Sequence, residues 1–223
     1  MKLDTLRRHA AISTATGLAL ATLASCGTAA RTGPASSATI PADAVQLPLA
    51  QRVSAGLARI RHTSDNPPGD QWTHYKDASG TIWYFWPLPD GRYCFGKEFR
   101  LGDQDIREVG CSSDPLPDDG GPAVKALHGP ASTDHGGWVS FLYADQEEVQ
   151  DVSCGDARLT ATRIGTFPGP LGPRVLYAVP TPWAVLGVLH ARVRHADGTI
   201  APDQVKFPDG NGSAHVSSER VCT

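Results

Sequence analysis

Apolar residues at helical spacing mark the first predicted element. Within residues 47–61, four apolar positions lie three or four residues apart and share one face of a helix: Leu49, Val53, Leu57 and Ile60. Pro48 suits the first helical turn, because its missing N–H would have no partner there. The turn-forming residues 65–70 end the pattern. The spacing therefore predicts one amphipathic helix over residues 47–61.

Turn signals divide the next stretch into four predicted strands. Residues 77–80, Asp90-Gly91 and Gly102-Asp103 each combine residue types that favour tight turns. The segments between them are rich in aromatic and alternating apolar residues, which favour strands. The predicted strands span residues 71–76, 81–87, 92–99 and 105–111. Short turns between successive strands predict an antiparallel four-strand meander.

The turn at Gly102-Asp103 also predicts a register, in which the numbers of paired residues sum to 205. Cys94 then faces Cys111 at a non-hydrogen-bonded site, where side chains approach most closely. The same register aligns four further complementary pairs: Glu98 with Arg107, Arg100 with Asp105, Lys97 with Glu108, and Phe99 with Ile106. The alignment predicts a disulfide between Cys94 and Cys111. Lys97 and Glu108 share a face with Phe95 and Phe99, so that face is not expected to be fully dry.

Beyond residue 112 the pattern changes twice. Residues 113–137 are rich in Pro, Gly, Asp and Ser, which predicts a linker or long loop. Short strands are then expected near residues 138–143, 147–153, 157–164, 174–179, 184–196 and 199–206. Strands at this spacing favour a small β-sandwich-like unit over residues 138–223. The expected fold class is mainly β (α+β), with a helix and meander over residues 44–112 followed by this second unit.

The first 26 residues contain the features of an export signal. Lys2, Arg7 and Arg8 precede a short run of small and apolar residues, which is typical of a signal peptide over residues 1–25. The run ends in Leu-Ala-Ser-Cys, which resembles the lipobox of bacterial lipoproteins. The resemblance implies that Cys26 carries acyl chains such as palmitate and becomes the mature N-terminus. Acyl chains stabilise membrane attachment by roughly 0.8 kcal/mol per buried methylene, so the anchor is expected to be stable.

Charge and composition extend this picture. Residues 26–43 are mostly small or polar and predict a flexible tether. Cleavage before Cys26 would remove three basic residues and one acidic residue. It would leave 17 basic against 22 acidic residues, a net charge of −5. That charge argues against a nucleic-acid partner, because binding phosphates requires a basic surface. The layout resembles small extracytoplasmic lipoproteins of GC-rich Gram-positive bacteria.

Four cysteines remain once Cys26 is acylated. Outside the cytoplasmic membrane disulfides are stable, and four cysteines allow three pairings. The hairpin register selects Cys94 with Cys111 and leaves Cys154 with Cys222. The second bridge would hold the late segment around Cys222 onto the second half of the chain.

The aromatic residues gather in one short stretch. Half of the 16 aromatic residues lie between Trp72 and Phe95. Strand alternation places Trp83 on one face, with Tyr84 and Trp86 on the other. They predict a strand buried on both faces, one of them against the helix. The alternative is a partly exposed platform formed by Trp83, Tyr84 and Trp86 that stacks on a glycan or a partner protein.

A basic ladder is predicted on a later strand. His190, Arg192 and Arg194 alternate with apolar residues, which favours a solvated strand face. The alternative is contact with an anionic wall polymer or lipid headgroup. A third group, His128, Asp134 and His135, combines metal-ligating residue types, but no fourth ligand is apparent. No metal and no cofactor are therefore expected.

Motif content completes the functional expectation. The sequence lacks the common motifs of hydrolases, redox enzymes and nucleotide-binding proteins. A non-enzymatic protein is expected, anchored by lipid to the outer face of the cell membrane and binding an envelope protein or a wall polymer. Its action could be to modulate a membrane sensor or envelope assembly. The alternatives are a glycan- or small-ligand-binding lipoprotein and, third, an unrecognised envelope enzyme.

Overall fold

The predicted helix and the first sheet are both present. The computed structural model describes residues 47–101, 104–116, 123–133, 136–169, 172–207 and 219–223. Within them α1 (Leu49–Thr63) buries Val53, Leu57 and Ile60, whereas Leu49 in its first turn is 41% exposed. This helix, with 15 residues, is too short and too polar to cross a membrane, and the described residues hold no other helical candidate for a span. Cys26, the signal peptide and the tether lie outside the described residues.

Sheet A is the predicted meander. It consists of β1 (Thr73–Lys76), β2 (Ile82–Pro87), β3 (Tyr93–Leu101) and β4 (Gln104–Cys111), in chain order and antiparallel. The register between β3 and β4 pairs Cys94 with Cys111, Lys97 with Glu108 and all the other predicted partners, and the first disulfide is present. The turn residues Gly102 and Asp103 lie outside the described residues. Sequence alternation and turn position therefore predicted this register correctly.

Sheets B and C complete the described part of the chain. Sheet B has the order β5-β6-β10-β9, with β5 (Val124–Ser132), β6 (Trp138–Asp145), β9 (Thr162–Gly169) and β10 (Gly172–Thr181). Sheet C has the order β12-β11-β7-β8, with β7 (Glu148–Cys154), β8 (Ala157–Leu159), β11 (Ala184–Arg194) and β12 (Ile200–Lys206). A further strand of sheet C, β13 (Glu219–Cys222), pairs in parallel with β11. The fold is mostly β, with antiparallel sheets and one helix.

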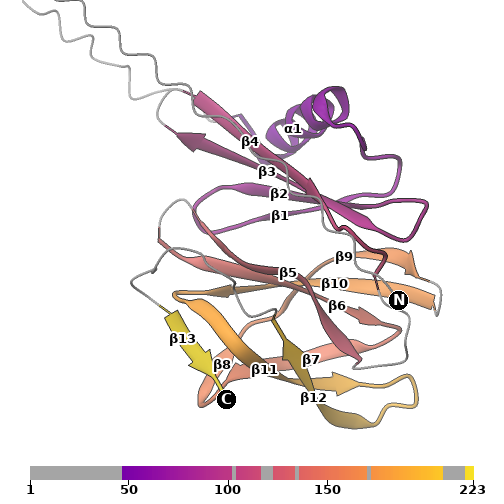
Figure 1. The fold of residues 1–223 in the computed structure, drawn as a ribbon, viewed down its shortest axis with the longest axis vertical. Helices are drawn as coiled ribbons and strands as arrows, with labels where there is room; N and C mark the ends of the chain where they lie inside the picture. Colours follow the sequence, from indigo (N-terminus) through magenta and orange to yellow (C-terminus); the bar gives the residue numbers. More distant parts are fainter. Residues whose placement is uncertain (1–46, 102–103, 117–122, 134–135, 170–171, 208–218) are drawn as a thin grey trace, which may run out of the picture. The chain divides into compact units, whose positions relative to one another are not determined.

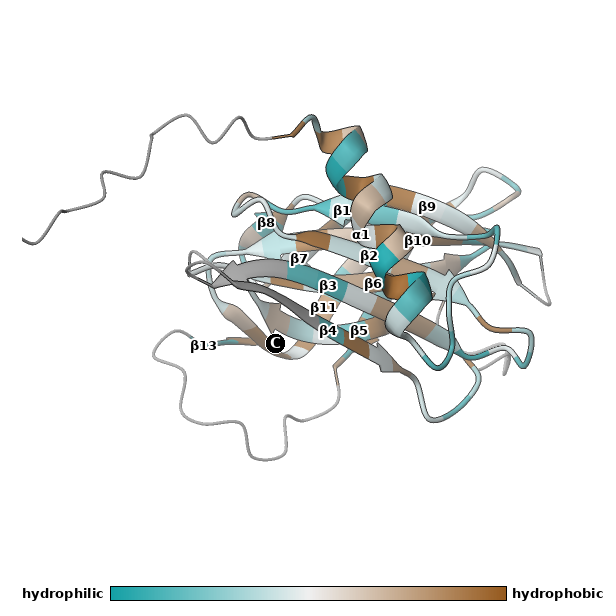
Figure 2. Ribbon diagram, turned by 90° about the horizontal axis from the view of Figure 1, so that it is seen from above, coloured by the Kyte–Doolittle hydropathy of each residue, from teal (hydrophilic) through white to brown (hydrophobic). Residues whose placement is uncertain are grey.

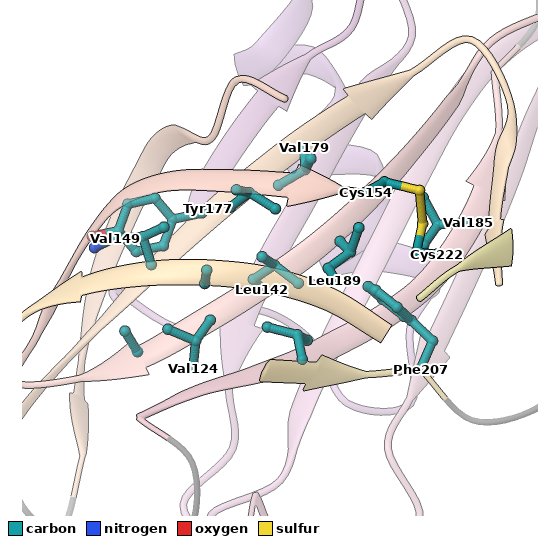
Figure 3. Close-up of a cluster of buried hydrophobic side chains, with 14 of the residues drawn as sticks. Val124, Leu142, Val149, Cys154, Tyr177, Val179, Val185, Leu189, Phe207 and Cys222 are labelled. Atoms are coloured by element: carbon teal, nitrogen blue, oxygen red, sulfur yellow. Dashed lines mark hydrogen bonds between the residues drawn. A yellow bond between two sulfur atoms is a disulfide. The ribbon is translucent and has the colours of Figure 1, made fainter. Parts of the chain in front are cut away.

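Three hydrophobic clusters hold these elements in layers (Figure 1). The first lies between α1 and sheet A, the second between sheets A and B, and the third between sheets B and C. Figure 2 shows α1 lying across the strands, with hydrophobic and hydrophilic residues alternating around it. Figure 3 shows the third cluster, in which Leu142 and Tyr177 of sheet B meet Val149 and Leu189 of sheet C beside the second disulfide, Cys154–Cys222. Residues 45–223 form one compact unit, because sheet B packs on both neighbours.

Two sequence predictions, for residues 113–137 and for residues 157–164, were wrong. Residues 113–137 are not only linker, since β5 occupies residues 124–132. Gly129 and Pro130 argued against a strand in the sequence. However, β5 is an edge strand, and its register shifts between His128 and Ala131. Proline is tolerated at a bulge in an edge strand. The strand predicted near residues 157–164 is in fact two strands, β8 in sheet C and β9 in sheet B. The chain crosses between the sheets at Thr160 and Ala161.

Candidate functional site

The aromatic cluster is core and not a platform. Trp83, Tyr84 and Trp86 are each at most 1% exposed, so the alternative of an exposed stacking surface is wrong. As alternation predicted, Trp83 faces sheet B, whereas Tyr84 and Trp86 face α1. The physical reason is that β2 is an inner strand of a sheet covered on both faces, where large aromatic residues bury the most area.

The polar atoms of these aromatic residues are satisfied inside the fold. Trp83 Nε1 donates to Asp77 Oδ2 at 3.1 Å, and Trp86 Nε1 donates to the carbonyl of Asn66 at 2.9 Å. The hydroxyl of Tyr84 donates to the carbonyl of Val53 at 3.3 Å, and burial raises its pKa far above the usual value. A buried tyrosine or tryptophan with its hydrogen bond made has little left to offer a ligand.

The basic ladder lies on a solvated face, as predicted. Arg192 and Arg194 are exposed on β11, and Val193 between them is buried. The Arg192 side chain, 59% exposed, lies 3.4 Å from Asp151, and Arg194 donates to Gln150 at 3.1 Å. His190 pairs with Ser153 on one side and Gln204 on the other. Because neighbouring polar and acidic residues already engage the ladder, its attraction for a polyanion is reduced.

Of the predicted group His128, Asp134 and His135, only His128 lies within the described residues. Asp134 and His135 lie outside them, and His128 of β5 stacks on Phe95 of β3 with ring centroids 4.2 Å apart. Burial lowers the pKa of His128, Glu108 raises it and Lys97 lowers it. Across the described ranges no group of three His, Cys, Asp or Glu residues is placed to hold a metal ion.

A pocket that sequence analysis missed opens between sheets A and B. It lies where the β2–β3 turn faces the β9–β10 hairpin and has a volume of about 80 Å³. Its floor is buried and mostly apolar: Phe85, Leu127, Phe167, Arg174 and Leu176. Its rim is half-buried or exposed: Pro87, Leu88, Gly91, Arg92, Tyr93, Leu116 and Pro168. An apolar concavity with a few polar groups at its edge is the usual form of a small-molecule site.

The charged group in the floor is held by its own neighbours. Arg174 is 5% exposed and donates to both carboxylate oxygens of Asp145, at 2.6 and 3.0 Å. Its guanidinium also lies over the ring of Tyr143, 4.6 Å from the centroid. Asp145 holds the buried Arg174 in place through both oxygens, and removing either partner would leave an uncompensated buried charge.

The polar groups at the rim have unused hydrogen-bonding capacity. Arg92 donates from Nε to Asp90 Oδ2 at 2.8 Å. Its two terminal nitrogens have no hydrogen-bond partner among the described residues. The hydroxyl of Tyr93 is protonated at neutral pH, as that of an ordinary tyrosine is, and burial raises its pKa further, to about 12. That hydroxyl also lacks a protein partner within the described ranges. Two side chains that line the pocket, Arg92 and Tyr93, thus retain available donors.

No simple signal in the sequence marks this pocket. Its residues come from β2, β3, β5, β9 and β10 and the loops beside them, and Asp90-Gly91 was evident only as a turn. Such a site appears only when the sheets are packed together.

Comparison with known protein families, with curated proteins and with solved structures finds no match for the chain.

Proposed function

We propose that the protein is a lipid-anchored, non-enzymatic binding module on the outer face of the cell membrane. The Leu-Ala-Ser-Cys sequence ending at Cys26 supports the anchor. The observation that carries the binding role is the pocket between sheets A and B, with its apolar floor and the two donor side chains at its rim, Arg92 and Tyr93. An anchored module meets its partner at a raised effective concentration, so even a shallow pocket serves as a binding site.

The lining of the pocket favours a small apolar group over a glycan. Glycan recognition usually relies on exposed aromatic faces, and the aromatic residues of β2 are buried. The pocket suits a small apolar group, carried either by a free ligand or by a partner polypeptide. The basic ladder gives less support to a wall polymer, because Asp151 and Gln150 engage it. We also interpret sheets B and C as a β-sandwich, since one cluster fills the space between them.

The anchor is tested by replacing its cysteine. In Cys26→Ser the acylated thiol is lost, so we expect the protein to leave the membrane fraction for the medium or to remain uncleaved. Fractionation with immunoblotting, together with mass spectrometry of the N-terminal peptide, measures both outcomes. A correctly cleaved Cys26→Ser protein that stays in the membrane fraction would overturn the proposed anchor. Ser25→Ala, one residue earlier, is the matched control and should still be acylated.

The binding role is tested on the protein isolated from its own membrane. Native mass spectrometry should find a bound component in the wild type that is lost in Leu116→Trp, whose larger ring fills the pocket from the rim. Arg194→Gln on the far sheet should retain the component. Absence of any component from the wild type, or equal retention in Leu116→Trp, would count against the pocket as the binding site.

A further inference from the structure

The volume and lining of the pocket restrict what can fill it. About 80 Å³ is room for several groups of the size of a water molecule or a methyl group, since one water needs roughly 10–15 Å³ of such space. Water needs two to four polar partners at each position, and the floor offers mainly the side chains of Phe85, Leu127 and Leu176. A cavity lined in this way is better filled by a compact aliphatic group. A branched group of three or four carbons fits it, whereas a long straight chain would leave most of its length in water.

The rim adds an electrostatic requirement. Arg92 presents two terminal nitrogens and Tyr93 a protonated hydroxyl, and all of these groups are donors. A ligand oxygen that accepts hydrogen bonds and carries negative charge suits them best, because hydrogen bonds to charged groups are the stronger kind. Arg174 is not part of this requirement, since Asp145 already takes its charge.

We propose that the pocket binds a short branched aliphatic group adjacent to a carboxylate, with the aliphatic group inside and the carboxylate on Arg92 and Tyr93. The proposal rests on the proposed function and names the ligand class of the same site. Two sources carry this chemistry: a polypeptide that ends in a branched aliphatic residue, and a free branched-chain acid. In both, a carboxylate lies a few bonds from the aliphatic group.

Asp90 is already paired with Arg92 and would compete with a ligand carboxylate for it. Asp90 forms an ion pair with Arg92 at 2.8 Å, with side-chain exposures of 52% and 32%. An exposed pair of this kind is weak, so a ligand carboxylate competes with Asp90 for the same guanidinium. Asp90 Oδ1 also accepts from the backbone N–H of Arg92, a bond that an asparagine oxygen preserves. Asp90→Asn therefore removes the competing charge and keeps the turn.

The experiment measures binding of N-acetyl-leucine, N-acetyl-leucinamide and 4-methylpentanoate to the purified chain by ligand-observed NMR. The wild type should bind the first more tightly than its uncharged amide. Arg92→Gln should weaken N-acetyl-leucine roughly tenfold and leave the amide unchanged. Asp90→Asn should tighten N-acetyl-leucine by up to roughly fivefold, again without changing the amide. Arg194→Gln on β11 is the control for a general loss of positive charge.

Each outcome decides a separate point. Tighter binding of N-acetyl-leucine than of 4-methylpentanoate identifies a chain terminus as the source, and the reverse identifies a free acid. Equal binding of acid and amide, or no response to Arg92→Gln and Asp90→Asn, would overturn the assigned ligand class. If none of the three probes binds while Leu116→Trp still loses the native component, the ligand class is wrong and the binding role stands. If no native component exists either, the binding role fails as well.

Discussion

Replacing Gly56 by alanine sets two known effects against each other. Gly56 lies on the buried face of α1, where glycine normally costs a helix about 1 kcal/mol relative to alanine. Helix propensity alone therefore predicts that Gly56→Ala stabilises the protein. The new Cβ, however, would lie 2.1 Å from the hydroxyl of Tyr84 and 2.3 Å from Glu98 Oε2.

The structure decides which effect is larger. Ordinary contact begins near 3.4 Å, so the Tyr84 oxygen would have to move by about 1.3 Å. The ring of Tyr84 is fully buried, and Arg59 holds Glu98 with bonds of 3.0 and 2.8 Å. Overpacking of this kind typically costs 1–3 kcal/mol or more. The large displacement of a buried group puts the cost in the upper part of that range, about 2–3 kcal/mol. After subtracting the propensity gain of about 1 kcal/mol, we expect Gly56→Ala to lower the free energy of unfolding by about 1–2 kcal/mol.

Urea unfolding followed by tryptophan fluorescence measures the change, and the melting temperature should fall by roughly 2–8 °C. Ala58→Gly on the exposed face of the same helix is the control, and it should lose only the propensity difference. Adding Tyr84→Phe removes the clashing oxygen, so Gly56→Ala should cost less in that background than alone. A Gly56→Ala protein that is more stable than the wild type would refute the packing argument.

Two further predictions concern the bridges and pH. Replacing Cys154 and Cys222 by alanine should lower the free energy of unfolding by about 4.5 kcal/mol, and replacing Cys94 and Cys111 by about 3 kcal/mol. The difference arises because the two bridges close loops of 68 and 17 residues. The reverse order in urea titrations would contradict this loop argument. Burial lowers the pKa of His128 below 6.5, so its stabilising contribution is complete above pH 6.5 and declines as pH falls toward the lowered pKa. His128→Gln should flatten the loss of stability between pH 7.5 and 5, and an unchanged slope would argue against this source.

Local sequence signals predicted much of the first half. The register of β3 with β4 followed from one turn, because a shift of one residue would have misaligned Cys94, Cys111 and every charge pair. Burial of β2 on both faces followed from its aromatic content. In the same region, the hydrogen bond from Lys97 to β5 could not be predicted. Its ammonium lies 4.8 Å from the ring of Trp83 and donates to the carbonyl of Ser132 on β5, a strand that the sequence did not reveal.

The features that sequence missed depend on contacts between distant segments. The break between β8 and β9 has no strong turn signal, yet it moves the chain from sheet C to sheet B. Asp203 of β12 accepts from the backbone N–H of Val124 at 2.8 Å, linking the edges of β12 and β5 across 79 residues. The pocket between sheets A and B is of the same kind, since its floor and its rim each combine residues of both sheets. Hydrophobic periodicity describes one element at a time and carries no information about such pairings.

The two disulfides also set an order for oxidative folding. Cys94 and Cys111 lie in one hairpin, so they can pair as soon as residue 111 reaches an oxidising environment, whereas Cys154 must wait for Cys222, 68 residues later. During that wait Cys154 is the reactive thiol of an unfinished sheet, because β11 gains its partner β13 only with residues 219–222. Early closure of the hairpin bridge removes the two thiols with which Cys154 could mispair. The register of the β3–β4 hairpin, which one short turn determines, thus favours correct pairing of Cys154 with Cys222, both far outside that hairpin.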